Sequence, residues 1–74
     1  MPTTDTQPPA VDHPTYPPSQ LATFELAAYR RQLESAIAFF DRQDPVPPAR
    51  ANLKARLDGV LAEQEQRAKT AHAR

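Results

Sequence analysis

Few side chains in this sequence have the types and spacing that catalysis requires. Ser35 has no histidine close to it in the sequence, and His13 and His72 lie near opposite ends of the chain. Glu63 and Glu65 are two residues apart, so they do not face each other on a helix. A nucleophile or acid–base group also needs a partner that tunes its pKa and a cleft that excludes water. We therefore expect no catalytic residue and a role other than that of an enzyme.

The composition predicts that no cofactor or metal is bound. The chain has no cysteine, and two widely separated histidines do not supply the ligands of a zinc site. Gly59 is the only glycine, which excludes the glycine-rich loops that hold phosphates in P-loop and dinucleotide sites. For the same reasons we expect no small-molecule substrate.

The remaining polar chemistry is a cluster of bases. Arg50, Lys54 and Arg56 lie close together, and Arg30 and Arg31 add two more bases earlier in the chain. Such residues can contact phosphates, so a small nucleic-acid-binding or antitoxin-like regulatory protein is one interpretation. However, the nine basic and nine acidic residues cancel, which leaves no overall field to attract nucleic acid or anionic membrane. Binding to another protein is the preferred interpretation.

No segment has the features of a membrane or export signal. The sequence contains no run of about 18 apolar residues. It also has neither a charged-then-apolar N-terminal signal nor a lipidation motif. These features predict a cytoplasmic protein that does not insert into a membrane.

Residues 1–18 are rich in proline and poor in apolar side chains. Six prolines stand among Thr, Asp and Gln, and Val11 and Tyr16 are the only sizeable apolar residues after Met1. Such a segment buries too little surface to offset its ordering entropy, so we predict a disordered tail. Tyr16 lies within a Pro-Thr-Tyr-Pro-Pro motif, whose PxxP spacing suits a docking motif. The alternative is an inert, solvated tail.

The rest of the chain predicts two helices joined by a proline-rich turn. We expect the first helix over residues 19–43, with Ser19 as its N-cap. The three prolines of residues 44–48 end this helix, and the last of them can open a second helix over residues 48–69. Residues 70–74 are expected to fray. So short a connection makes the helices antiparallel neighbours.

Each predicted helix has one apolar stripe at the spacing of a coiled-coil seam. Two helices alone bury these stripes only partly, so we expect an all-α antiparallel hairpin completed by oligomerisation or by a partner protein. The stripes consist of Ala22, Leu26, Tyr29, Leu33, Ala36, Ile37 and Phe40 on the first helix, and of Leu53, Leu57, Val60, Leu61, Gln64 and Ala68 on the second, whose apolar part ends at Leu61.

Other residues form the predicted partner-binding sites. Four apolar residues of the first helix lie away from its seam, with Phe24 almost opposite Leu33. The second helix has small residues at four-residue spacing, which would let another helix approach closely, although alanine is also simply a good helix former. We expect a non-catalytic protein–protein interaction module, either an accessory subunit or adaptor of a larger complex or a homo-oligomer. Its predicted partner-binding residues are Leu21, Phe24, Ala28, Phe39, Ala51, Ala55, Gly59 and Tyr16.

Overall fold

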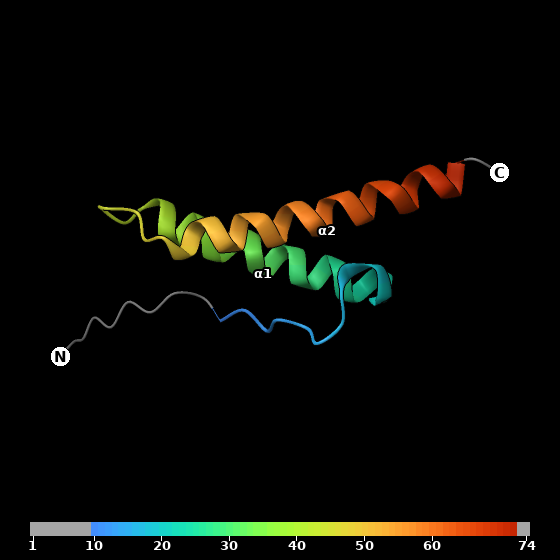
Figure 1. Ribbon diagram of the computed structural model, residues 1–74, viewed down its shortest axis with the longest axis horizontal. Coiled ribbons are helices and arrows are strands. Elements are labelled where there is room, and N and C mark those ends of the chain that lie inside the picture. The colour runs from blue at the N-terminus through green and yellow to red at the C-terminus, as the bar shows by residue number, and fades with distance from the viewer. Residues whose placement is uncertain (1–9, 73–74) are drawn as a thin grey trace.

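Two antiparallel α-helices form the body of the protein (Figure 1). The computed structural model describes residues 10–72. Within this range it contains a short 3-10 helix, η1 (Pro18–Gln20), and two α-helices, α1 (Thr23–Asp41) and α2 (Ala49–His72), with no strand. The predicted all-α hairpin is confirmed. No helix in the described part of the chain has both the length and the apolar character needed to cross a membrane.

The inner seam of the hairpin lies where the apolar periodicity predicts it. Leu26, Leu33 and Val60 are fully buried. Phe40 and Leu61 pack at its edges, half-buried. Burying a Leu or Val side chain contributes about 1.5–3 kcal/mol, which makes this seam the main source of hairpin stability. The buried core comprises Leu21, Leu26, Tyr29, Leu33, Ala36, Ile37, Leu53, Leu57 and Val60.

The start of α1 differs from the prediction. Ser19 does not cap α1 but lies within η1, and α1 begins at Thr23 with Ala22 as its N-cap. The backbone N–H of Leu21 bonds the carbonyl of Pro18 at 3.1 Å, after which the chain is extended. Glu25 accepts a hydrogen bond from the Ala22 backbone N–H at 2.8 Å, which satisfies a donor at the helix start.

The end of α1 and both ends of α2 also differ from their predicted boundaries. α1 ends at Asp41, two residues earlier than expected, and α2 begins at Ala49. An ion pair between Arg50 and Asp41 links the two helices across the proline turn. α2 continues to His72, three residues past its predicted end at residue 69, while residues 73 and 74 lie outside the described range.

The proline-rich segment before η1 packs against the hairpin. Residues 10–17 run in an extended conformation alongside it (Figure 1). The Asp12 backbone N–H donates to Gln32 at 2.8 Å, and His13 Nδ1 lies 2.7 Å from the Tyr29 hydroxyl. Val11 packs on the buried core. The predicted disordered tail is therefore too long at its C-terminal end, and its first nine residues lie outside the described range.

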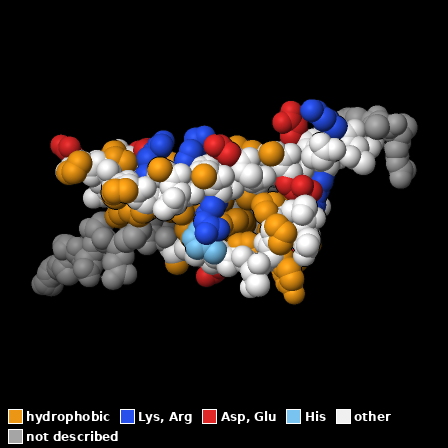
Figure 2. Space-filling model, in the orientation of Figure 1, with side chains coloured by type: hydrophobic (Ala, Val, Ile, Leu, Met, Phe, Trp, Pro, Cys, Tyr) orange, Lys and Arg blue, Asp and Glu red, His pale blue; other side chains and the backbone are white. Residues whose placement is uncertain are grey.

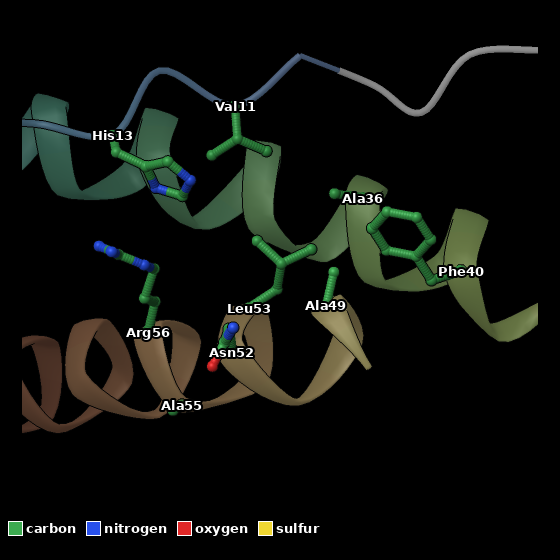
Figure 3. Close-up of a pocket in the computed structure, with 9 residues that line it drawn as sticks. All are labelled: Val11, His13, Ala36, Phe40, Ala49, Asn52, Leu53, Ala55 and Arg56. Atoms are coloured by element: carbon green, nitrogen blue, oxygen red, sulfur yellow. The ribbon is translucent and has the colours of Figure 1, made fainter. Parts of the chain in front are cut away.

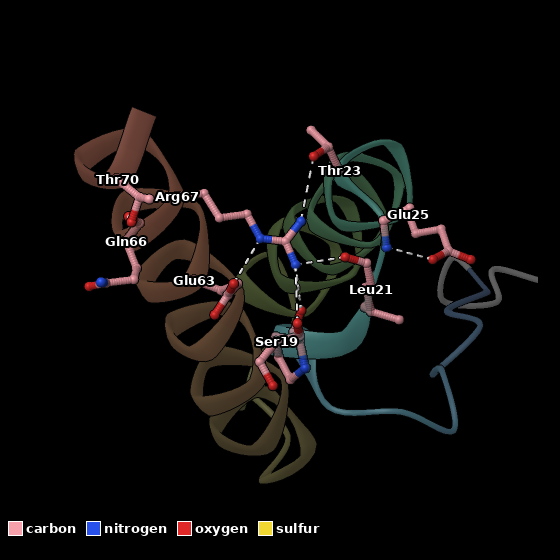
Figure 4. A network of polar contacts seen from close by, with 10 residues as sticks. Ser19, Leu21, Thr23, Glu25, Glu63, Gln66, Arg67 and Thr70 are labelled. Atoms are coloured by element: carbon pink, nitrogen blue, oxygen red, sulfur yellow. Dashed lines mark hydrogen bonds and ion pairs between the residues drawn. The ribbon is translucent and has the colours of Figure 1, made fainter. Parts of the chain in front are cut away.

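Arg67, in the second half of α2, forms hydrogen bonds to the segment that precedes α1 (Figure 4). Its guanidinium donates to the carbonyl oxygens of Leu21 at 2.7 Å, Pro18 at 3.3 Å and Ser19 at 3.4 Å. Glu63, one helical turn earlier, accepts from Arg67 Nε at 2.7 Å and so orients the guanidinium. One side chain thereby bonds the carbonyls of Ser19 and Leu21 and adds a second donor to that of Pro18, which also accepts from the Leu21 N–H.

Candidate protein-binding surface

Leu21 does not belong to an exposed surface. The prediction placed it with Phe24 on the outer side of a helix, but its side chain is only 6% exposed and lies in the core. The reason is local geometry, because η1 and an extended residue precede α1 and the helical angle does not apply to Leu21. Leu21 is thus a core residue, and its predicted position on an exposed outer surface was wrong.

The outward side of α1 carries an exposed row of residues, which we call the α1 outer stripe. Phe24 is 74% exposed, the largest exposed fraction of any large apolar side chain in the described residues. Ala28 and Phe39 are half-buried, and Phe39 meets Phe40 edge to face with ring centroids 5.7 Å apart. The stripe comprises Phe24, Ala28, Arg31, Ser35 and Phe39, which follow one another three or four residues apart along α1.

A small hollow adjoins the N-terminal end of the α1 outer stripe. It encloses about 210 Å³ between α1 and the segment that precedes η1. Phe24 and Ala28 line one side, and Pro14 lines the other. A large exposed side chain beside a shallow hollow allows the side chains of a partner to interlock with this surface.

Arg31, at the centre of the α1 outer stripe, forms no ion pair with any residue between 10 and 72. Sequence reasoning considered Arg31 only as a possible phosphate contact. Arg31 follows Phe24 by seven residues, which is about two helical turns. This spacing is the signal in the sequence that places both residues on one side of α1. The surface therefore combines an exposed aromatic ring with an exposed positive charge.

The basic cluster at the start of α2 is largely neutralised within the hairpin. Arg50 pairs with Asp41, and Lys54 pairs with Asp58 at 2.8 Å. Arg56 reaches the hydroxyl of Tyr29 at 3.5 Å. Two of the three bases thus already face a carboxylate, which leaves less charge for phosphates than the sequence suggests.

Three other predicted residues meet at a second hollow. Tyr16, Ala55 and Gly59 line a space of about 500 Å³ between the proline segment and α2. Tyr16 is 62% exposed, so its ring is accessible from solvent. Ala51 is exposed and does not line this space, so the predicted row of small residues is only partly brought together with Tyr16.

Gly59→Ala tests whether the hairpin itself needs a glycine within α2. A Cβ at this position would meet nothing within 4 Å, so the hairpin does not need glycine here. Gly59→Ala is expected to raise the free energy of unfolding by about 0.5–1 kcal/mol, because glycine is costly in a helix interior. Urea denaturation followed by circular dichroism measures this. A loss of stability would show that the helix is distorted at Gly59.

Among the side chains that the structure describes, residues 10–71, no three of the types His, Cys, Asp or Glu gather closely enough to hold a metal ion. Comparisons with protein families, with curated proteins and with solved structures found no match to this chain. We therefore infer a function from the geometry of the hairpin.

Proposed function

We propose that this protein is a non-catalytic protein–protein interaction module, an accessory subunit that docks on a helix of another protein through the α1 outer stripe. The observation that carries this proposal is the exposure of Phe24. Phe24 is 74% exposed on helix α1, beside a hollow lined by Leu21 and Ala28.

The exposed Phe24 side chain can contribute more to the free energy of binding than to the stability of the hairpin. The ring adds nothing to the inner seam, because it projects from the opposite side of α1. Fully burying a phenylalanine contributes about 1.5–3 kcal/mol, and aromatic anchors in central pockets dominate many interfaces. Helix α1 already orders the backbone of Phe24, so docking at this position has to order only the side chain.

Arg31 favours a different protein over a second copy of this chain. If two copies packed face to face through their outer stripes, their Arg31 side chains would lie close together near the centre of the interface. Like charges that are desolvated together are unfavourable. A partner helix with apolar residues on either side of an Asp or Glu would instead cover Phe24 and Phe39 and pair with Arg31.

Phe24→Ala is expected to weaken partner binding at least tenfold and to leave the fold intact. The loss follows from removing the anchor ring, whereas an exposed substitution changes the free energy of unfolding by no more than about 0.5 kcal/mol. A photo-reactive amino acid at position 24 identifies the partner in cells, and calorimetry with the purified partner then gives the affinities. Arg31→Glu should weaken the same complex through charge reversal.

The matched control is Val46→Ala, which shortens another exposed apolar side chain that lies outside the α1 outer stripe and beyond the opposite end of α1 from Phe24. Val46 is 46% exposed in the turn between the helices. This variant should bind as tightly as the parent chain. Equal affinities for Phe24→Ala and the parent chain would contradict the proposed surface. A homodimer that light scattering shows to dissociate on Phe24→Ala would contradict a heterologous partner.

A further inference from the structure

A groove separate from the α1 outer stripe runs between the N-terminal segment and the two helices (Figure 3). Its volume is about 730 Å³, within the usual range of small-molecule sites. In Figure 3, Val11, Phe40 and Leu53 lie toward one end, while His13 and Arg56 lie at the other. The groove is lined by Val11, His13, Ala36, Phe40, Ala49, Asn52, Leu53, Ala55 and Arg56.

The polar end of the groove is organised around a buried tyrosine. Tyr29 is 6% exposed, and its hydroxyl lies 2.7 Å from His13 Nδ1 and 3.5 Å from Arg56 Nη1. The His13 ring also stands edge-on to the Tyr29 ring, with centroids 5.7 Å apart. These contacts hold the imidazole and the guanidinium at the same end of the groove.

Arg56 retains hydrogen-bonding capacity in this position. Its contact with Tyr29 is long and uses one nitrogen, and it forms no ion pair within the described range 10–72. Asn52 lies one helical turn earlier on the groove side of α2 and adds an amide. The planar guanidinium fork matches a carboxylate, so an anion is the natural complement of this end.

The other end is apolar. Leu53 is 9% exposed, and Val11 and Phe40 pack half-buried against the core. Figure 2 shows hydrophobic side chains gathered between the helices and the N-terminal segment on this face. From Ala49 to Arg56 the helix rises roughly 10 Å, which suits a medium-length aliphatic chain lying along α2.

We propose that this groove binds a small carboxylate with an aliphatic or aromatic body, its carboxylate on Arg56 beside His13 and Asn52 and its body along Val11, Phe40 and Leu53. No residue of the α1 outer stripe lines the groove. The site therefore goes beyond the proposed protein-binding function, and neither proposal depends on the other.

Octanoate is the probe, titrated into the full chain labelled with nitrogen-15 and followed by amide chemical shifts. We expect a Kd on the order of 1 mM or tighter, as for a ligand of this size. The shifts should concentrate at residues 11–13, 36–40 and 49–56. Hexanoate should bind more weakly, by up to about fourfold for each missing methylene group.

The charge requirement is tested by substitution and by probe chemistry. Arg56→Gln should weaken octanoate binding about tenfold, because a charge-assisted hydrogen bond is lost. Lys54→Gln removes the same charge from α2 outside the groove lining and should leave the affinity unchanged. Equal binding of octylammonium, equal weakening by both substitutions, or the absence of saturable shifts in the groove would overturn the proposal.

Discussion

Replacing Leu33 by alanine is expected to lower the free energy of unfolding by about 2–5 kcal/mol. Leu33 is fully buried in the middle of α1, where it packs in the inner seam with Leu57 and Val60 of α2. The loss combines the transfer energy of the missing atoms with the cavity that remains. Since small domains are stable by only about 5–15 kcal/mol, this is a large fraction of the total.

Urea denaturation followed by far-ultraviolet circular dichroism measures this loss. Phe24→Ala serves as the control, because Phe24 lies on the same helix and is 74% exposed. That variant should unfold within about 0.5 kcal/mol of the parent chain. A loss below about 1 kcal/mol for Leu33→Ala would show that α1 and α2 do not pack through this seam.

Arg67→Met is expected to lower the free energy of unfolding by about 1–3 kcal/mol and to loosen the start of α1. The substitution keeps the aliphatic stem but removes the hydrogen bonds that the guanidinium donates to the carbonyls of Pro18, Ser19 and Leu21. The Leu21 carbonyl accepts a partly buried bond at 2.7 Å, so it loses its partner in a place that water reaches poorly. Hydrogen exchange should then accelerate for residues 21–27 more than for residues 50–57.

Two substitutions separate the hydrogen bonds of Arg67 from its charge. Arg67→Lys keeps the positive charge, but its single nitrogen cannot occupy the two separate positions from which Arg67 Nε bonds Glu63 and Nη2 bonds the carbonyls, so most of the loss should remain. Lys69→Met removes an equal charge from α2 where the ion pair to Glu65 is exposed and 3.9 Å long, and it should change stability very little. If Lys69→Met were as destabilising as Arg67→Met, the network around Arg67 would not hold the hairpin together.

The hairpin and its inner seam follow from local patterns in the sequence. Leu26, Leu33 and Leu57 stand at helical spacing, and the prolines of residues 44–48 end one helix and open the next. Such signals act over one or two turns of helix, so they can be found without knowing the rest of the fold. The high exposure of Phe24 follows from the same periodicity.

The helix termini and the N-terminal segment were predicted less well. The four-residue spacing of Glu63 and Arg67 is a local pattern in the sequence, but Arg67 also bonds carbonyls up to 49 positions away. Likewise, nothing in the spacing of His13 indicates that it meets Tyr29. These contacts depend on where the helices bring distant segments together, which composition and periodicity do not describe.

The sequence by itself determined that this chain forms an antiparallel helical hairpin with Phe24 outside its seam, because helical periodicity and proline stops are local properties. Only the tertiary structure decided that α1 begins at Thr23, that Leu21 lies in the core, and that residues 10–17 line a groove with α1 and α2. The physical reason is that backbone carbonyls and apolar side chains near the proline segment find their partners on α2, far away in sequence.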